Sequence, residues 1–213
     1  MTEPIKVLLV DDHPVVRAGY RHLLQSAAGI TVIAEASDSS SAYEAFRAGE
    51  PDVVVMDISL PGVSGIDVMK RLLAQRPECR VLIFSMHDEA IFVSRAMRAG
   101  AAGYLSKSSA PEKLIDAVRA LARGERYTLC AAAKDGTAGV TRDGPAARLS
   151  ELSHREAEVF RLWAQGLSFD DIGRRLGLSE KTVTNYQSLV RQKLGMRNDV
   201  QLLRLAAEIW SGR

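Results

Sequence analysis

Up to about residue 124, short continuous apolar runs alternate along the chain with stretches whose apolar residues recur every three or four positions. Short apolar runs, rich in β-branched residues, lie at residues 5–10, 31–36, 52–57, 80–85 and 102–107. Each run is followed by a stretch in which apolar residues have the spacing of an amphipathic helix. Runs that are apolar on both faces and separated by helices are typical of a parallel sheet covered on both sides. The pattern predicts an α/β domain over residues 1–124, with a doubly wound five-stranded parallel sheet.

The pattern changes after this domain. Residues 125–148 contain glycines, a proline and small side chains without a sustained apolar period, and they predict a linker. Residues 149–213 return to helical spacing, and four helix starts there follow Ser153, Ser168, Ser179 and Asn198. The second and third helices are joined only by residues 176–179, the tight connection of a helix-turn-helix. We expect a C-terminal all-α domain of four helices.

Two of the expected helix starts match the capping box, in which a hydroxyl and an acid three residues later cap each other's backbone. One is Ser109 with Glu112, before the last helix of the α/β domain, and the other is Ser153 with Glu156. Both pairs predict where a helix begins.

The third helix of the C-terminal domain has a polar face without acids. With Val183 turned inward, the opposite face carries amides, hydroxyls and cations, and no acidic residue occurs between Lys181 and Asn198. Such a face suits the major groove, where amides and hydroxyls read base edges and cations meet phosphates. The alternative is the solvated face of an ordinary bundle, which the tight turn and the missing acids disfavour. The predicted DNA contacts are Lys181, Thr182, Thr184, Asn185, Ser188, Arg191, Gln192 and Lys193.

The fourth helix has two apolar stripes, more than one core contact requires. One stripe is formed by Val200, Leu203, Ala207 and Trp210, and the other by Leu202, Leu205, Ala206 and Ile209. We take the first stripe as a candidate surface for a homodimer, which would place two reading helices on successive half-sites. Coverage of this stripe by the linker or by the first domain is the alternative, and the sequence leaves both open.

The composition and charge of the chain indicate the kind of partner and the cellular compartment to expect. The net charge is +2, and the basic excess lies from Ala147 onward, where an anionic partner is expected. The longest apolar runs are too short to span a membrane, and the N-terminus lacks the pattern of a signal peptide, so we expect a cytoplasmic protein without a membrane partner. Cys79 and Cys130 lack metal-ligand spacing and are expected to be reduced thiols.

Chemically active side chains follow the expected strands. Asp11 and Asp12 follow the first strand, Asp57 the third, Ser85 ends the fourth and Lys107 follows the fifth. A strand order of 2-1-3-4-5, as in flavodoxin, brings all of them to one edge of the sheet. Clustered carboxylates repel unless a cation joins them, and hard oxygen ligands suit Mg²⁺. A carboxylate beside Mg²⁺ and a lysine can accept a phosphoryl group, although each residue taken singly is more often a cap or a solvated charge.

Longer motifs contain these residues: V-D-D-H-P at 10–14, D-I-S-L-P-G-V-S-G at 57–65, and Y-L-S-K at 104–107. The C-terminal part carries L-S-H-R-E at 152–156, L-G-L-S-E-K-T-V at 176–183 and K-L-G at 193–195. Together they resemble the NarL/FixJ family of bacterial response regulators, a receiver domain joined to a LuxR-type helix-turn-helix. The chain departs from the family at Gly173, where an alanine is usual, and at Thr184 and Ser188, where many relatives carry basic residues.

The resemblance implies a role for each residue of the pocket. Asp57 would accept a phosphoryl group from a sensor histidine kinase, and Asp12 and Asp57 would bind Mg²⁺ with the carbonyl of Ser59, while Asp11 acts through water. Lys107 would pair with the phosphate. Ser85 and Tyr104 would form the pair that moves on phosphorylation, and Ser59 and His87 occupy positions that tune the lifetime of the phosphate.

The resemblance implies a transcription factor of a two-component system, not an enzyme, which binds double-stranded promoter DNA and forms a homodimer on phosphorylation or on DNA. Two alternatives remain. One is a degenerate receiver whose DNA binding is independent of phosphorylation. The other is a Mg²⁺-dependent phosphohydrolase with Asp57 as nucleophile, but such enzymes place an acid where this chain has Ser59.

Overall fold

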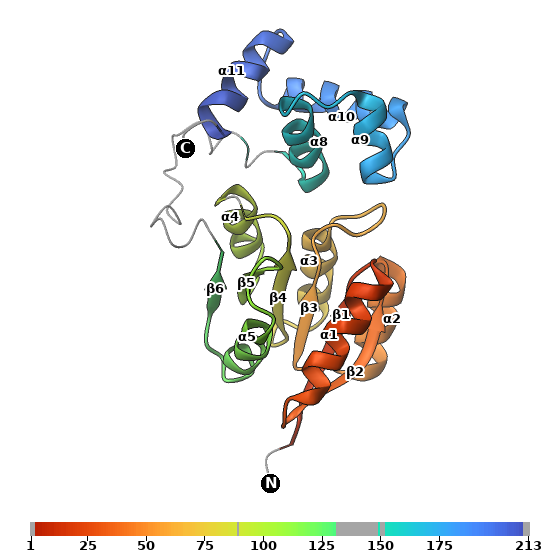
Figure 1. Ribbon diagram of the computed structural model, residues 1–213, viewed down its shortest axis with the longest axis vertical. Coiled ribbons are helices and arrows are strands. Elements are labelled where there is room, and N and C mark those ends of the chain that lie inside the picture. The colour runs from red at the N-terminus through yellow and green to blue at the C-terminus, as the bar shows by residue number, and fades with distance from the viewer. Residues whose placement is uncertain (1–2, 89, 131–148, 150–151, 211–213) are drawn as a thin grey trace. The chain divides into compact units, whose positions relative to one another are not determined.

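A computed structural model of the chain describes residues 3–88, 90–130, 149 and 152–210. Two compact units, Met1–Ala138 and Gly139–Arg213, make up the chain (Figure 1). Among the described helices, none is both long enough and apolar enough to cross a bilayer.

The first unit is a parallel sheet with helices on both faces. Its strands are β1 (Ile5–Val10), β2 (Ile30–Ala36), β3 (Val53–Met56), β4 (Arg80–Ser85), β5 (Gly103–Ser106) and β6 (Tyr127–Leu129). Its helices are α1 (Pro14–Ser26), α2 (Ser39–Gly49), α3 (Gly65–Gln75), α4 (Ala90–Arg98) and α5 (Glu112–Ala122). The strand order is β2-β1-β3-β4-β5-β6, so the predicted doubly wound fold is confirmed.

The sixth strand corrects the sequence prediction at one edge of the sheet. Tyr127 pairs with Gly103 of β5 in a parallel register, so residues 127–129 belong to the sheet and not to a linker. This strand has three residues, too few for an alternating pattern to be recognised. Residues 131–148 of the predicted linker lie outside the described residues.

Alternation along the strands divides the core of this unit into two layers. Val7 and Leu9 of β1 face α1 and α5, where they pack in one cluster with Leu24 and Val118. The intervening positions, such as Leu8, are also fully buried, on the opposite face, where α2 packs against β1 and β2. Burial on both faces explains why the strands are continuously apolar.

The second unit consists, among the described residues, of α8 (His154–Ala164), α9 (Phe169–Leu176), α10 (Glu180–Lys193) and α11 (Asp199–Trp210). The four predicted helices are thus present. Their core includes Val159, Leu162, Ile172 and Val183, all buried.

The helix starts confirm one predicted capping box and correct the other. Ser153 Oγ accepts the Glu156 N–H, and the Glu156 carboxylate accepts the Ser153 N–H at 2.6 Å. At the other position the prediction was wrong, because Pro111 takes the N-cap of α5 and no side chain caps that helix. Proline has a fixed φ suited to a helix start, and this moved the first helical residue to Glu112.

Candidate functional site

The acidic pocket lies at the carboxyl edge of the sheet, where neighbouring strands end side by side. Asp57 N–H donates to the carbonyl of Val10 at 2.9 Å, which aligns the end of β3 with the end of β1. Lys107 N–H donates to the carbonyl of Ser85 at 2.8 Å and aligns β5 with β4 in the same way. Backbone pairing therefore brings together side chains that are far apart in the sequence, as the strand ends predicted.

One ammonium group joins two carboxylates in this pocket. Lys107 Nζ lies 2.6 Å from Asp11 Oδ2 and 2.7 Å from Asp57 Oδ2. All three side chains are buried, with exposed fractions of 8%, 2% and 5% respectively. Two buried carboxylates facing one buried cation leave an excess of negative charge, which favours a further cation.

The pKa values follow from this arrangement. Burial raises the pKa of Asp57, and the nearby Lys107 ammonium opposes that shift without cancelling it. For Lys107, burial lowers the pKa, but the carboxylates of Asp57 and Asp11 together outweigh burial and the pKa is raised. The lysine is therefore held in its charged form beside the carboxylates.

The loop after β3 holds the second oxygen of Asp57. Ser59 N–H donates to Asp57 Oδ1 at 3.2 Å, and Ser59 Oγ lies 3.4 Å from His87 Nε2. The first residue of α3 must be glycine, because a Cβ at position 65 would lie 1.8 Å from the backbone oxygen of Asp57. The start of α3 thus packs directly on the backbone of Asp57, and a side chain at Gly65 would displace it.

The donor atoms fit a hard divalent cation. Ligand atoms of Asp11, Asp12, His13 and Asp57 all lie within 4.8 Å of one another. Asp12 Oδ1 is buried and accepts no hydrogen bond from the described residues, although His13 Nδ1 lies 2.8 Å from it. Carboxylate oxygens in this number, one of them without a donor, suit Mg²⁺, and these residues are the ones that could hold it.

Both residues of the predicted switch pair bind the backbone of His87. Tyr104 is fully buried, and its hydroxyl donates to the His87 carbonyl at 2.5 Å. Ser85 Oγ accepts the His87 N–H at 3.3 Å. The segment after β4 is therefore held from both sides by side chains of β4 and β5.

In the second unit, the turn between α9 and α10 runs close to the backbone of Gly173. Leu178 N–H donates to the Gly173 carbonyl at 2.8 Å, and a Cβ on Gly173 would lie 2.7 Å from the Leu178 carbonyl oxygen. Gly177 ends α9 with a φ of 65°, a left-handed conformation that glycine adopts without strain. The helix-turn-helix predicted from the short connection is present.

The outer face of α10 is polar and exposed, while Val183 and Val190 are buried beneath it. Thr184 Oγ1 donates to the Glu180 carbonyl, and Ser188 Oγ donates to the Thr184 carbonyl, each at 3.0 Å. These hydroxyls keep only acceptor capacity for a base edge. The exposed residues of the predicted set are Lys181, Thr184, Asn185, Ser188, Gln192 and Lys193, and their contact with DNA stays a prediction.

The two cations near the end of α10 have partners within the unit. Lys193 Nζ lies 2.9 and 2.8 Å from the two carboxylate oxygens of Glu156, which is buried. Arg191 Nη1 lies 4.0 Å from Asp199 Oδ1. The pairing of Glu156 with Lys193 was not predicted from the sequence, although the capping box had marked Glu156 as an ordered acid.

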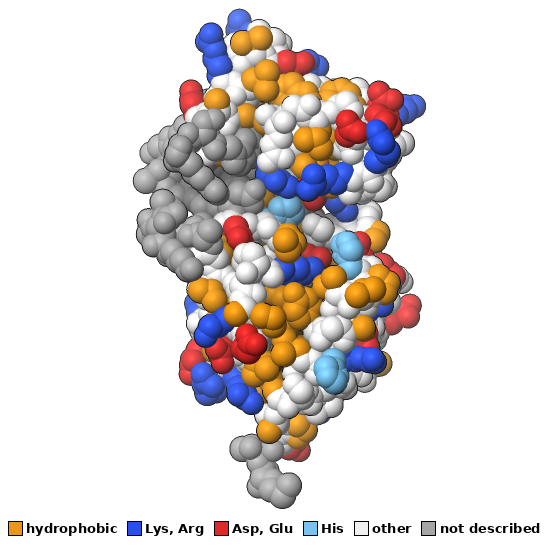
Figure 2. Space-filling model, viewed as in Figure 1, with side chains coloured by type: hydrophobic (Ala, Val, Ile, Leu, Met, Phe, Trp, Pro, Cys, Tyr) orange, Lys and Arg blue, Asp and Glu red, His pale blue; other side chains and the backbone are white. Residues whose placement is uncertain are grey.

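The structure distinguishes the two stripes of α11. Leu202, Leu205 and Ala206 are buried. Val200 and Leu203 of the candidate dimer stripe are 59% and 45% exposed, and hydrophobic surface is visible over α11 in Figure 2. Ala207 is exposed as well, while the side chain of Trp210 lies outside the described residues.

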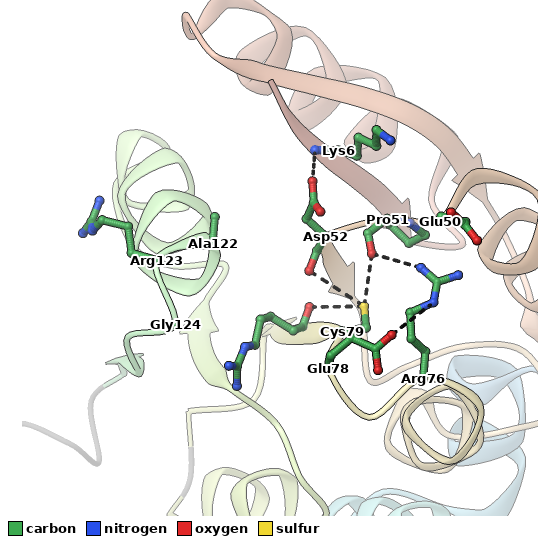
Figure 3. A pocket seen from close by; sticks show the side chains of 11 residues that line it. Lys6, Glu50, Pro51, Asp52, Arg76, Glu78, Cys79, Ala122, Arg123 and Gly124 are labelled. Atoms are coloured by element: carbon green, nitrogen blue, oxygen red, sulfur yellow. Dashed lines mark hydrogen bonds and ion pairs between the residues drawn. The ribbon is translucent and has the colours of Figure 1, made fainter. Parts of the chain in front are cut away.

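A separate open pocket of about 610 Å³ is lined by residues near the amino ends of β1, β3 and β4 (Figure 3). Lys6, Asp52, Arg76 and Cys79 are among the residues that line it. Burial raises the pKa of the Cys79 thiol to about 11. This pocket mixes both signs of charge and none of the predicted site residues contributes to it.

Comparison with known proteins finds two families in the chain. Residues 7–119 match the response regulator receiver domain, and residues 150–206 match the bacterial regulatory proteins of the luxR family. The chain is 36% identical over 203 residues to the response regulator UvrY of Escherichia coli O6:H1, which covers 95% of this chain and 93% of UvrY. It is 38% identical over 209 residues to the transcriptional activator protein ExaE of Pseudomonas putida, covering 95% of each.

Solved structures show the same likeness. RcsB of Salmonella enterica serovar Typhimurium, bound to a promoter in the presence of the phosphomimetic BeF₃⁻, has a TM-score of 0.64 at 27% identity, over 96% of this chain and 99% of that one. A two-component response regulator of the LuxR family from Aurantimonas sp. has a TM-score of 0.60 at 40% identity, over 64% of this chain and 96% of that one.

Proposed function

Because the chain belongs to the NarL/FixJ family of response regulators, a receiver domain joined to a LuxR-type DNA-binding domain, we propose that phosphorylation of Asp57 controls its binding to DNA. The observation that carries the proposal is the Lys107 ammonium, held 2.7 Å from Asp57 Oδ2 and 2.6 Å from Asp11 Oδ2. A buried carboxylate with a lysine and further acids beside it is an arrangement suited to phosphoryl transfer.

In the proposed reaction, a sensor histidine kinase is the phosphoryl donor. An oxygen of the Asp57 carboxylate forms a bond to phosphorus while the bond from phosphorus to the histidine nitrogen of the donor breaks, and that electron pair stays on nitrogen. Lys107 already stands beside the acceptor oxygen and neutralises charge on the phosphoryl oxygens. The Ser59 N–H, 3.2 Å from Asp57 Oδ1, orients the carboxylate.

Asp12 and Asp57, with the carbonyl of Ser59, are the residues that would hold Mg²⁺, and Asp11 would act through water. When bound, Mg²⁺ neutralises charge on the transferring oxygens. Asp12 Oδ1 is buried and makes no hydrogen bond with the described residues, which supports this assignment.

Phosphorylation would be read at the end of β4. A phosphoryl group on Asp57 draws the Ser85 hydroxyl toward its oxygens and releases the His87 N–H, which Ser85 Oγ now accepts at 3.3 Å. The His87 segment then moves relative to Tyr104, which holds its carbonyl. A change of this kind alters the surface formed by β4, β5 and their helices.

The output is a homodimer on double-stranded promoter DNA. The outer face of α10 enters the major groove, and the stripe of Val200, Leu203, Ala207 and Trp210 on α11 joins the two copies so that two α10 helices meet successive half-sites. RcsB, which is 27% identical to this chain, has been solved as dimers bound to DNA, and this supports a dimer as the DNA-bound form. A regulator with this partner acts in the cytoplasm, where the DNA lies.

The test is the intact mass of wild type and Asp57→Asn after incubation with Mg²⁺ and acetyl phosphate. Light scattering and binding to genomic DNA fragments are measured on the same samples. We expect wild type to gain one phosphoryl group that the variant lacks, and to bind DNA more tightly as a dimer. A phosphorylated dimer with unchanged DNA affinity refutes the coupling, and a mass that never shifts while DNA binding persists identifies a degenerate receiver.

A further inference from the structure

Arg17, in the first turn of α1, joins three elements beside the acidic pocket. Its Nη1 donates to the backbone carbonyl of Asp11 at 2.6 Å, where β1 has ended. Its Nε lies 3.3 Å from Glu35 Oε2 of β2. The side chain is only 18% exposed, so this fork is largely shielded from water. Arg17 thus connects α1, β2 and the segment that carries Asp11 and Asp12.

The contact with the Asp11 carbonyl reaches Asp12 through the peptide plane. The carbonyl of one residue lies in one plane with the N–H and Cα of the next, so a contact that holds the Asp11 carbonyl also limits where the Asp12 Cα can lie. Asp12 Oδ1 accepts no hydrogen bond from the described residues, and its orientation therefore depends on its backbone and on His13 Nδ1, 2.8 Å away.

Glu35 holds the Arg17 side chain in a fixed position. In the sheet, Glu35 is the register partner of Leu9, two residues before Asp11, so its carboxylate moves with the strand that supports the pocket. A guanidinium held at one end by Glu35 and at the other by a carbonyl has little freedom. On this basis we propose that Arg17 is a positioning residue of the Mg²⁺ and phosphoryl pocket, one that acts through the Asp11–Asp12 backbone. The inference rests on the proposed function.

Arg21 provides a matched control on the same helix. Its Nη1 lies 3.1 Å from Glu35 Oε1, so it shares the carboxylate with Arg17, but it is 50% exposed. Among the contacts of the described residues, Arg21 has none with Asp11. Exposed ion pairs contribute little to stability, and loss of Arg21 should leave the pocket as it is.

The charge of Arg17 and its positioning role predict opposite effects of its removal on the affinity for Mg²⁺. Loss of a cation close to the acidic cluster would, by charge alone, strengthen the binding of Mg²⁺. Loss of orientation at Asp12 would weaken it, as with other groups that orient metal ligands without touching the metal. Whether the affinity for Mg²⁺ rises or falls therefore distinguishes an effect of charge from an effect of positioning.

The experiment is calorimetric titration of MgCl₂ into the full chain, as wild type, Arg17→Ala, Arg17→Lys and Arg21→Ala. We expect the Kd for Mg²⁺ to rise about tenfold in both Arg17 variants, since lysine keeps the charge but cannot hold both partners. Arg21→Ala should stay within about twofold of wild type. Circular dichroism and melting curves on each variant report whether the fold is retained.

A folded Arg17→Ala variant that binds Mg²⁺ as tightly as wild type, or more tightly, overturns the proposal. If that variant does not fold, Arg17→Lys decides, and an unchanged Kd there has the same meaning. Failure of the proposed function looks different, because wild type itself would then neither bind Mg²⁺ nor gain mass with acetyl phosphate.

Discussion

Lys193 Nζ lies within hydrogen-bonding distance of both carboxylate oxygens of Glu156, at 2.9 and 2.8 Å, and so ties the end of α10 to the start of α8. The same carboxylate caps α8 by accepting the Ser153 N–H. One buried acid therefore organises two helix termini, and the exposed Lys193 at the end of α10 is paired with it.

The first prediction concerns this pair. Lys193→Ala should lower the free energy of unfolding of the second unit by about 1–3 kcal/mol, because it leaves the buried Glu156 without its cation. Trp163 and Trp210, the two tryptophans of the chain, both lie in this unit, so urea unfolding followed by tryptophan fluorescence measures it selectively. The control is Lys181→Ala, on the exposed face of α10. Lys181→Ala serves as a control for stability alone, because Lys181 is itself a predicted DNA contact. Equal stability of the two variants, with weaker DNA binding in Lys193→Ala, would instead identify Lys193 as a phosphate contact.

The second prediction concerns the tight turn. Gly173→Ala should destabilise the second unit by about 1–3 kcal/mol and weaken DNA binding, since its Cβ would lie 2.7 Å from the Leu178 carbonyl and the turn must open. Gly19→Ala is the contrasting change, because that helical glycine has open space around its Cβ and alanine should stabilise by about 0.5–1 kcal/mol. Thermal unfolding of both variants tests the contrast. A stabilised Gly173→Ala variant would show that the turn yields without cost.

The third prediction uses the raised pKa of Asp57. The pKa of Asp57 in the folded protein lies above the ordinary value of 3.8. Protonated Asp57 therefore favours the folded state. This contribution is complete below pH 3.8 and is lost as the pH rises through the folded-state pKa. At pH 7 without Mg²⁺, Asp57→Asn should therefore raise the melting temperature by about 2–4 °C. The gain should shrink as the pH is lowered toward 4.

Asp116→Asn is the control for that experiment, since Asp116 is half exposed and pairs with Lys113 on α5. Its melting temperature should follow wild type across the pH range. A destabilised Asp57→Asn variant at pH 7 would mean that the bond from Lys107 to Asp57 outweighs the burial of charge.

The fourth prediction concerns the exposed stripe of α11. Leu203→Glu should weaken dimerisation and DNA binding together by about tenfold or more, because a charge at the centre of an apolar contact is desolvated. Gln201→Glu places the same charge at an exposed polar position of the same helix and should have little effect. Analytical ultracentrifugation of the phosphorylated protein measures the monomer–dimer equilibrium. If Leu203→Glu still dimerises like wild type, the dimer interface does not include this stripe of α11.

Much of the architecture follows from local signals in the chain. Apolar runs and helical spacing predicted the parallel sheet, and the serines before the C-terminal helices predicted their starts, because period and capping act over a few residues. The pocket could also be anticipated, since side chains that end parallel strands must meet at one edge. The failure at Ser109 was local too, where Pro111 took the cap instead.

Other features depended on pairings between distant segments. The edge strand at Tyr127 exists because β5 offers it a partner, and three residues carry too little pattern to announce that pairing. Two equally apolar stripes on α11 could not be ranked by sequence, and only packing against the other helices showed that Leu202 is buried and Leu203 exposed.

By itself, then, the sequence determined the kinds of element, their order and the chemistry placed at the strand ends, because these depend on residues that are near neighbours in the chain. Tertiary structure alone decided which charges meet: Lys193 with Glu156, and Arg17 with Glu35. Such partners are separated by many residues, and a side chain several bonds long can reach them only after the backbone has folded.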